Sequence, residues 1–187
     1  MRVIAGSRRS LPLKSVPGSD TRPTTDRIKE TLFNILMPEI PGARFLDLFA
    51  GSGGIGIEAL SRGAEYACFA DRDQKAVKVI KENLAFTKFT DVSSVVMNDA
   101  ARLLSKQNRG EPYDVIFMDP PYGQGLEQEA VVRLLSGTGW MHEGSLIVVE
   151  ADIGTDFSWT ADTGCEIVRV KEYKTNKHVF MRVKRRN

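Results

Sequence analysis

The stretch from Phe45 to Gly56, Phe-Leu-Asp-Leu-Phe-Ala-Gly-Ser-Gly-Gly-Ile-Gly, limits the possible folds more than any other part of the chain. Its apolar start is typical of a buried parallel strand, and a helical pattern begins near Ile55. Between them, Gly51, Gly53 and Gly56 match G-x-G-x-x-G, in which glycine allows a tight turn and a close approach of the backbone to a ligand. The stretch therefore predicts a strand, a ligand-binding loop and a helix of an α/β sheet.

The glycine loop alone does not identify the ligand, because dinucleotide sites and S-adenosylmethionine sites share it. Asp47 lies four residues before Gly51 and adds the discriminating charge. A loop that binds a pyrophosphate gains nothing from a carboxylate at its mouth, whereas a ligand with an ammonium group and a sulfonium does. Asp47 therefore favours S-adenosylmethionine over NAD. A glycine turn in an α/β protein without a nucleotide remains the third possibility.

From residue 44 onward, apolar runs of strand length alternate with helical patterns. The predicted strands are 45–49, 66–70, 92–97, 113–118 and 146–149, and the predicted helices are 55–62, 74–86, 100–107 and 126–135. This alternation is typical of a doubly wound parallel sheet. Two further strand patterns, 167–173 and 178–183, are joined by four residues, too few for a crossover, and so must be antiparallel.

The N-terminal region has a different character. Short strand patterns at 2–5 and 11–14 predict a small hairpin, and a linker rich in Pro, Gly and Ser follows it. Thr25 is the predicted N-cap of a helix with one apolar face, which Pro38 ends. We therefore expect a basic hairpin and linker over residues 1–24 and a catalytic domain over residues 25–187.

Length and composition limit the class of protein. A chain of 187 residues is long enough for one well-buried domain. It contains no apolar run of the ~20 residues that a membrane span needs, and its N-terminus has no long apolar segment typical of a signal peptide. Its two cysteines, Cys68 and Cys165, lie in apolar segments, which predicts buried thiols and no metal site. These features predict a cytoplasmic protein.

Charge is distributed unevenly along the chain. Residues 1–30 contain seven Lys or Arg against three acids, and residues 166–187 contain eight against two, although the whole chain has a net charge of only +2. The middle is therefore acidic. Basic ends on an acidic body favour a polyanionic partner bound by the ends, with solubilising tails as the alternative.

Acidic residues recur where the predicted parallel strands end, which is the edge at which open α/β sheets bind ligands. Asp47 lies on the first strand, Asp99 follows the third, and Asp119 follows the fourth. Asp71 follows the second strand, 20 residues after Gly51, which is the spacing expected for a carboxylate that binds ribose hydroxyls. One such residue is often a helix cap, but four acidic residues at equivalent strand ends predict a ligand-binding site.

Two motifs carry a resemblance to a known family. Asp119-Pro120-Pro121-Tyr122 resembles the D/N-P-P-Y/F motif of methyltransferases that modify exocyclic amines. Arg22-Pro23-Thr24-Thr25-Asp26-Arg27 and the following Glu30-Thr31-Leu32-Phe33-Asn34 are similar to the bacterial RsmD-type 16S ribosomal RNA guanine-N2 methyltransferases. The resemblance covers nearly the whole chain. One departure is Asp71, where many relatives carry Glu, and this shortens the reach to the ribose.

The resemblance implies a fold, a cofactor and a site. The fold would be the Rossmann-like class I methyltransferase fold, with a doubly wound, mostly parallel seven-stranded sheet, an antiparallel C-terminal hairpin and a small N-terminal β-hairpin extension. The implied S-adenosylmethionine-binding residues are Asp47, Phe49, Gly51, Ser52, Gly53, Asp71, Arg72, Asp99 and Ala100. The implied catalytic residues are Asp119, Pro120, Pro121 and Tyr122. The basic residues expected to contact the substrate are Arg8, Arg9, Arg22 and Arg27.

In this interpretation a monomer methylates guanine N2 in 16S rRNA, within the small ribosomal subunit or its assembly intermediate. Two alternatives stay open. The first is an adenine-N6 DNA methyltransferase, although the chain has no room for a separate target-recognition domain. The second is a non-catalytic RNA-binding assembly factor, which the intact Asp119-Pro120-Pro121-Tyr122 disfavours.

Overall fold

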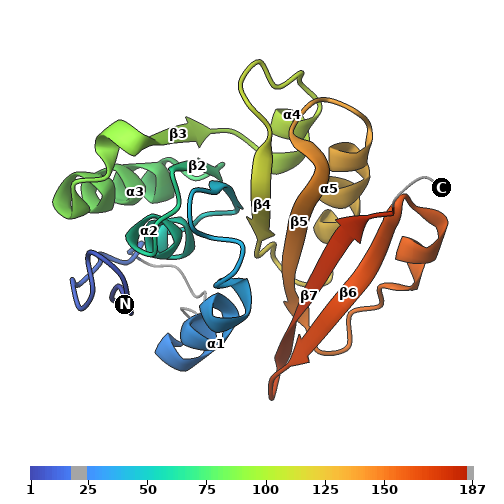
Figure 1. Ribbon diagram of the computed structural model, residues 1–187, viewed down its shortest axis with the longest axis horizontal. Helices are drawn as coiled ribbons and strands as arrows, with labels where there is room; N and C mark the ends of the chain where they lie inside the picture. The colour runs from blue at the N-terminus through green and yellow to red at the C-terminus, as the bar shows by residue number, and fades with distance from the viewer. Residues whose placement is uncertain (18–24, 185–187) are drawn as a thin grey trace. The chain divides into compact units, whose positions relative to one another are not determined.

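The structure is a computed structural model that describes residues 1–17 and 25–184. The chain forms two compact units, Met1–Asp99 and Ala100–Asn187, which are described separately (Figure 1). The predicted division between residues 24 and 25 falls at the edge of a segment outside the described residues and stays a prediction. In the described part of the chain, no helix has both the length and the apolar character needed to cross a membrane.

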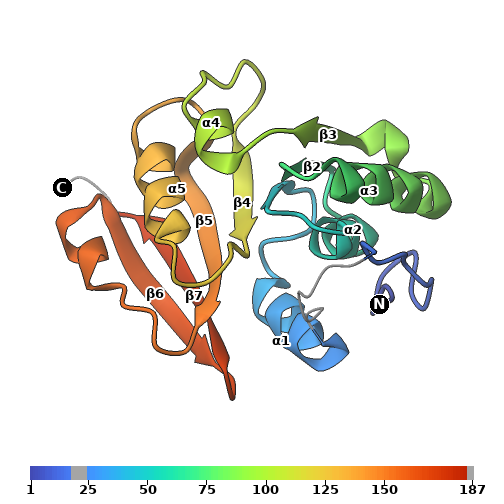
Figure 2. The ribbon, with the colours of Figure 1, turned by 180° about the vertical axis from the view of Figure 1, so that it is seen from behind.

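The first unit alternates helices and strands. Its elements are α1 (Asp26–Leu36), β1 (Arg44–Leu48), α2 (Gly54–Ser61), β2 (Tyr66–Asp71), α3 (Gln74–Thr87), the 3-10 helix η1 (Thr90–Val92) and β3 (Ser93–Met97). Strands β1, β2 and β3 pair in parallel, with Asp47 opposite Phe69. Helix α2 packs on β1 and β2, and α3 packs on β2 and β3, as both ribbon views show (Figures 1 and 2). The core between them is apolar, with Phe45, Ile57 and Ile80 fully buried.

The N-terminal segment is a hairpin, as predicted. Val3 donates its N–H to the Leu11 carbonyl at 3.0 Å, and Arg2 forms an antiparallel bridge with Pro12. The predicted N-cap is also confirmed, because the Thr25 side chain accepts a hydrogen bond from the Ile28 N–H.

A buried carboxylate fastens this hairpin to α1 and α2. Glu58 is fully buried and accepts hydrogen bonds from the backbone N–H groups of Ile4 at 2.8 Å and Ala5 at 3.0 Å. It also pairs with Lys29 at 3.2 Å and with Arg62 at 2.8 Å. Burial lowers the pKa of Lys29, and the charge of Glu58 opposes that shift. One side chain therefore holds three parts of the first unit together.

The second unit contains the remaining strands. Its elements are α4 (Ala100–Leu104), β4 (Tyr113–Met118), α5 (Leu126–Leu135), β5 (Met141–Asp152), the 3-10 helix η2 (Ser158–Asp162), β6 (Cys165–Glu172) and β7 (Asn176–Val183). Strands β4 and β5 are parallel, whereas β7 runs antiparallel to both β5 and β6. The strand order β3-β2-β1-β4-β5-β7-β6 confirms the expected seven-stranded, mostly parallel sheet with an antiparallel hairpin.

Two elements differ in length from the sequence predictions by three residues or more. Strand β5 has twelve residues instead of four, because it begins with the half-buried Met141 and the exposed segment from His142 to Gly144, and its end continues along β7. An irregularity in the pairing with β4 accommodates that polar segment. Helix α4 stops at Leu104, three residues early. Beyond it, the Lys106 N–H donates to the Leu103 carbonyl at 3.1 Å, and the Lys106 carbonyl accepts from the Trp140 indole N–H at 2.8 Å.

Candidate functional site

The loop after β1 has the backbone conformation that its glycines predict. Gly51 and Gly53 have φ angles of +56° and +79°, in the left-handed region. A Cβ added at Gly51 would meet no atom within 4 Å, so the loop backbone faces open space there. At Gly56, by contrast, a Cβ would lie 2.3 Å from the Phe69 ring, which explains the third glycine by close packing of helix on strand. Phe49 has a φ of +60°, a strained conformation that often occurs at functional loops.

Asp71 at the end of β2 holds this loop in place. Its Oδ2 accepts a hydrogen bond from the Gly51 N–H at 2.8 Å, and its Oδ1 accepts one from the Asp73 N–H at 2.8 Å. The 20-residue spacing seen in the sequence thus brings the carboxylate and the loop together. Each carboxylate oxygen has a second lone pair, so Asp71 can still accept ribose hydroxyls.

Asp47 lies beneath the loop and is 1% exposed. Its Oδ2 accepts a hydrogen bond from the Gly56 N–H at 2.9 Å, in the first turn of α2, where the N-cap residue Gly53 has no side chain to do so. Burial raises the pKa of Asp47 to about 7, the nearby charge of Asp71 adds to the rise, and the Gly56 hydrogen bond opposes it. The side chain therefore caps a helix as well as supplying a carboxyl group near the loop.

This pKa predicts a pH-dependent stability. A carboxyl group whose pKa is raised in the folded state contributes its full stabilisation at pH values below its unfolded-state pKa of ~4. This contribution is lost as the pH rises through the folded-state pKa of about 7. Asp47→Asn keeps an acceptor for the Gly56 N–H but does not titrate. Between about pH 5 and pH 8, wild type should lose ~1–3 kcal/mol of unfolding free energy relative to this variant. Urea denaturation of wild type and variant at several pH values measures this difference in unfolding free energy. A difference that does not change with pH would contradict the raised pKa of Asp47.

The other predicted cofactor residues occupy the surroundings of this loop or the strand ends. Ser52 is half-buried within the loop, Arg72 is exposed directly after β2, and Asp99 is half-buried after β3. Ala100 is buried and begins α4 in the second unit. The open backbone at Gly51, together with two carboxyl groups on β1 and β2, suits a ligand that has hydroxyls and a positive charge. Gly51, Asp47 and Asp71 of the first unit therefore have the groups that S-adenosylmethionine would need.

The Asp119-Pro120-Pro121-Tyr122 motif follows β4 in the second unit. The strand is buried from Val115 to Met118, Asp119 is half-buried, and Pro120 is buried. Tyr122 is 47% exposed, which leaves part of its ring accessible to a stacking partner. Burial of the hydroxyl raises the pKa of Tyr122, and the carboxylates of Glu150, Asp119 and Asp152 raise it further. Tyr122 is therefore a neutral phenol in an acidic surrounding.

A buried polar cluster near Tyr122 was not identified from the sequence. Its members are Glu150 on β5, Tyr173 in the turn after β6, and Asn176 and His178 on β7. The predicted strand 146–149 ends before Glu150, and the predicted strand 178–183 begins after Asn176. The two-residue period of a strand places Asn176, His178 and the buried Phe180 on one face, but the polar run from Asn176 to His178 shows no alternation that would have marked the cluster.

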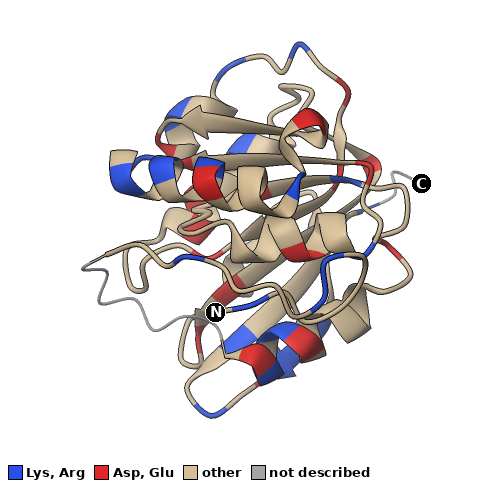
Figure 3. Cartoon of the chain, turned by 90° about the vertical axis from the view of Figure 1, so that its left-hand side faces the viewer, with Lys and Arg blue, Asp and Glu red and all other residues tan. Residues whose placement is uncertain are grey.

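The predicted substrate arginines differ in their surroundings. Arg8 is half-buried, because its Nε donates to the Thr87 carbonyl at 2.7 Å and its guanidinium lies 5.2 Å from the centre of the Phe89 ring. Arg9 and Arg27 are exposed, and Arg22 lies outside the described residues. Figure 3 shows basic and acidic positions interspersed along the helices that face the viewer. The structure thus leaves Arg9 and Arg27 more accessible to a partner than Arg8.

Comparison with known proteins identifies the family. Residues 1–182 match the family described as conserved hypothetical protein 95. YlbH of Bacillus subtilis (strain 168) is 46% identical over 81% of this chain and 83% of that protein. Ribosomal RNA small subunit methyltransferase D of Escherichia coli (strain K12) is 41% identical over 82% of this chain and 75% of that protein. The solved structure of yhhF from Escherichia coli has a TM-score of 0.85 and 35% identity, and covers 100% of this chain and 99% of that one.

The sequence resemblance and the fold thus lead to the same group of proteins. The matches cover most of the length of each relative, and the solved structure matches both units of this chain. The chain belongs to the conserved hypothetical protein 95 family, the family of the small-subunit ribosomal RNA methyltransferases D.

Proposed function

We propose that this protein transfers a methyl group from S-adenosylmethionine to the exocyclic N2 of a guanine in 16S rRNA of the small ribosomal subunit. The observation that carries the proposal is Asp119-Pro120-Pro121-Tyr122 directly after β4, in a chain that belongs to this methyltransferase family. Membership of the family supports a methyltransferase that acts on ribosomal RNA. The motif supports an exocyclic amine as the acceptor, and the sequence resemblance supports guanine N2.

The proposed cofactor residues follow from the contacts of the first unit. The loop from Gly51 to Gly53 would cradle the amino-acid part, with Phe49 beside it and Asp47 near the amino group. Asp71 would accept the ribose hydroxyls, with Arg72 next to it, and Asp99 would lie near the adenine amine. S-adenosylmethionine supplies the methyl group as an electrophilic sulfonium, so transfer needs alignment more than acid–base chemistry.

The second unit would activate the acceptor. The lone pair of an exocyclic amine is delocalised into the aromatic ring, which makes the nitrogen a poor nucleophile. The Asp119 carboxylate and the Pro120 carbonyl can accept both N–H groups and favour a pyramidal nitrogen whose lone pair is localised. Pro121 has no N–H to compete for these acceptors. The exposed ring of Tyr122 would stack on the base once it has left its own stack.

Mass mapping of rRNA tests the proposal directly. Ribosomal RNA from cells with and without the protein should differ by one methyl group at one guanine of 16S rRNA. Purified protein and labelled S-adenosylmethionine should then restore the mark on small subunits from the deleted strain. Labelling of adenine in DNA would instead support the DNA methyltransferase alternative, and binding to RNA without any labelling would support the assembly-factor alternative.

The two adjacent arginines of the N-terminal hairpin, Arg8 and Arg9, predict how binding responds to salt. Phosphate contacts position a protein without reading bases, and each lost contact flattens the slope of log K against log salt by ~0.7–0.9. The double variant Arg8→Ala/Arg9→Ala should therefore weaken RNA binding and flatten this slope, while its affinity for S-adenosylmethionine is unchanged. Binding titrations over a salt series measure the slope.

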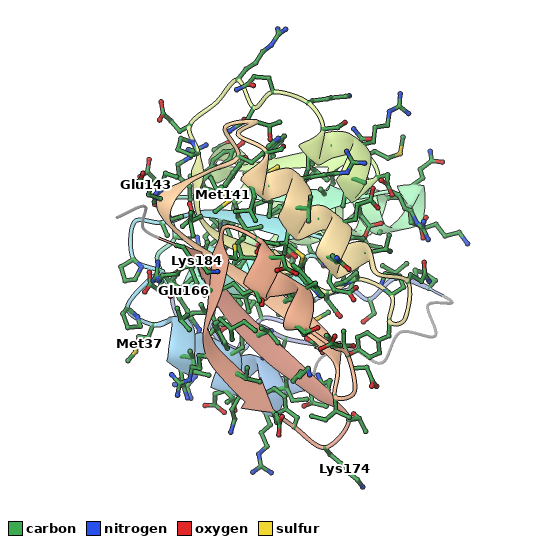
Figure 4. The ribbon with its side chains drawn as sticks, turned by 90° about the vertical axis from the view of Figure 1, so that its right-hand side faces the viewer. Met37, Met141, Glu143, Glu166, Lys174 and Lys184 are labelled. Atoms are coloured by element: carbon green, nitrogen blue, oxygen red, sulfur yellow. The ribbon has the colours of Figure 1, made fainter. Side chains whose placement is uncertain are left out.

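The two single variants serve as matched controls. Arg9 is exposed, so Arg9→Ala should account for most of the change in slope. Arg8→Ala removes packing on Phe89 and the bond to the Thr87 carbonyl, so it should mainly lower the melting temperature. If the double variant keeps the wild-type salt slope, the N-terminal arginines do not contact RNA, and their charge serves solubility instead. The RNA contacts would then be sought on the β6–β7 hairpin, whose tip residue Lys174 points outward (Figure 4).

The proposed partner also suggests the location and assembly of the protein. Small ribosomal subunits and their assembly intermediates are found in the bacterial cytoplasm, so we place the protein there. We further propose that it acts as a monomer.

A further inference from the structure

The N-terminal hairpin packs against helix α3 of the first unit, and it lies next to α2 and α3 in both ribbon views (Figures 1 and 2). The Lys14 N–H donates to Asn83 Oδ1 at 2.9 Å, and Asn83 Nδ2 donates back to the Lys14 carbonyl at 3.0 Å. One turn further along the helix, Arg8 Nε donates to the Thr87 carbonyl at 2.7 Å. Asn83 and Thr87 are buried, so the hairpin is fixed along the second half of α3.

The exposed face of α3 is basic. Lys75, Lys78 and Lys81 recur every three residues along the helix, and Lys88 is its C-cap residue. All four lysines are exposed. Residues three apart are neighbours on a helix surface, so positive charge accumulates along one side of α3.

The hairpin neutralises the acidic residue of this helix and adds a further positive charge. Glu82 is the acid within α3, and its carboxylate lies 2.7 Å from the ammonium group of Lys14. In the described part of the chain, the four exposed lysines of this face take part in no ion pair. Arg8 contacts the residues on either side of Lys88, and the exposed Arg9 follows it. Basic residues from two distant parts of the sequence thus form one surface.

A row of unpaired ammonium groups fits a partner with closely spaced negative charges. Lysine binds phosphate as a point charge on a flexible stem, and phosphate contacts position a protein on nucleic acid without reading bases. A protein partner would need an apolar centre, whereas α3 exposes one large apolar side chain, Phe86. A single aromatic ring among lysines suits RNA, because such rings stack on unpaired bases.

We propose that α3 and the N-terminal hairpin form one RNA-binding surface, in which Lys78, Lys81 and Lys88 bind phosphates of the ribosomal RNA beside Arg9. The identity of this RNA rests on the proposed function. The surface contains none of the proposed cofactor-binding or catalytic residues, so it positions the enzyme on its substrate and takes no part in the chemistry. It also places RNA contacts in the middle of a sequence whose net charge there is acidic.

The salt dependence of binding measures the phosphate contacts. In the double variant Lys78→Ala/Lys81→Ala, the slope of log K against log salt for unmethylated small subunits should flatten by ~1.4–1.8, which is ~0.7–0.9 for each lost contact. The KM for the subunit should rise, while kcat and the affinity for S-adenosylmethionine stay at wild-type values. Both positions are exposed in a helix, where alanine is favourable, so the variant should fold.

The matched control is Lys106→Ala/Arg109→Ala. It removes the same charge from two exposed positions of the second unit, and it should keep the wild-type slope. A wild-type slope in Lys78→Ala/Lys81→Ala, or an equal flattening in the control, would overturn the proposed surface, because the lysines of α3 would then be only a solvated face.

A cross-link identifies the partner. Both native cysteines are buried, so a thiol-directed photo-cross-linker should react with Lys81→Cys at position 81 alone. Irradiation of the labelled variant bound to small subunits should join position 81 to 16S rRNA, whereas the same probe in Lys106→Cys should give no such product. Cross-links from position 81 to ribosomal protein alone would refute RNA as the partner of this surface.

These measurements separate the surface from the proposed function. A wild-type protein that binds small subunits but methylates none would refute the proposed function, and the salt slope and the cross-link would still decide the surface. A wild-type protein that methylates one guanine, together with an unchanged slope in Lys78→Ala/Lys81→Ala, would refute the surface alone.

Discussion

Replacing Asp119 with alanine should abolish methyl transfer, while the affinity for S-adenosylmethionine stays within about twofold of wild type. In the proposed mechanism, this carboxylate activates the acceptor amine and does not hold the donor. Removal of one preorganised electrostatic partner at a reacting centre costs on the order of 10²–10³ in kcat, and loss of Asp119 should reach at least that range. Single-turnover methylation of small subunits measures the rate, and calorimetry measures cofactor binding.

Asp114, on the strand that Asp119 follows, provides a control for this variant. It is partly exposed and pairs with His142 at 2.9 Å, in a contact that the proposed mechanism does not use. Asp114→Asn should therefore retain wild-type turnover. Near-wild-type rates in Asp119→Ala would refute the amine-activation role. A parallel loss of turnover and cofactor affinity would show that Asp119 holds the donor instead.

Replacing Glu58 with alanine should have the largest effect on stability, a loss of ~3–5 kcal/mol in unfolding free energy, the range for removing one partner of a buried ion pair. The change leaves the buried Lys29 without its carboxylate and leaves the N–H groups of Ile4 and Ala5 without their acceptor. Urea denaturation followed by circular dichroism measures the loss.

The exposed pair between Lys14 and Glu82, 2.7 Å apart, is the matched control. Glu82→Ala should cost at most ~1 kcal/mol, because solvent screens an exposed ion pair. The double variant Lys29→Met/Glu58→Leu should recover part of the loss in Glu58→Ala, since it removes the unpaired buried charge. Equal losses in Glu58→Ala and Glu82→Ala would show that the buried pair contributes little.

Much of the fold could be predicted because its signals are local. Apolar runs, glycines and the Thr25 cap each act over a few residues, and β4 and α5 have the predicted bounds. The start of β5 escaped prediction because its first residues are polar and exposed, and only pairing with β4 makes them a strand. Local pattern therefore predicts which elements exist better than it predicts where they end.

The buried polar residues needed the tertiary structure. Glu58 sits within a helix, where a glutamate is ordinarily a surface residue, and its partners are up to 54 positions away. Glu150 and His178 are 28 residues apart and meet only because β7 pairs with β5. Asp47 was recognised as a carboxylate near the loop, but its hydrogen bond to the first turn of α2 depends on how closely the helix approaches the strand. Such contacts leave no periodic trace in the sequence.

The order of strands in the second unit has a consequence for synthesis of the chain. Strand β6 is made before β7, yet β7 lies between β5 and β6 and pairs with both. While the ribosome is still adding β7, β6 has no neighbour in this sheet, and the charged Arg169 and Lys171 alternate with its exposed valines at 168 and 170. The buried partners of Glu150 also arrive with the last strand. The sheet of this unit is therefore complete only after β7 has emerged from the ribosome.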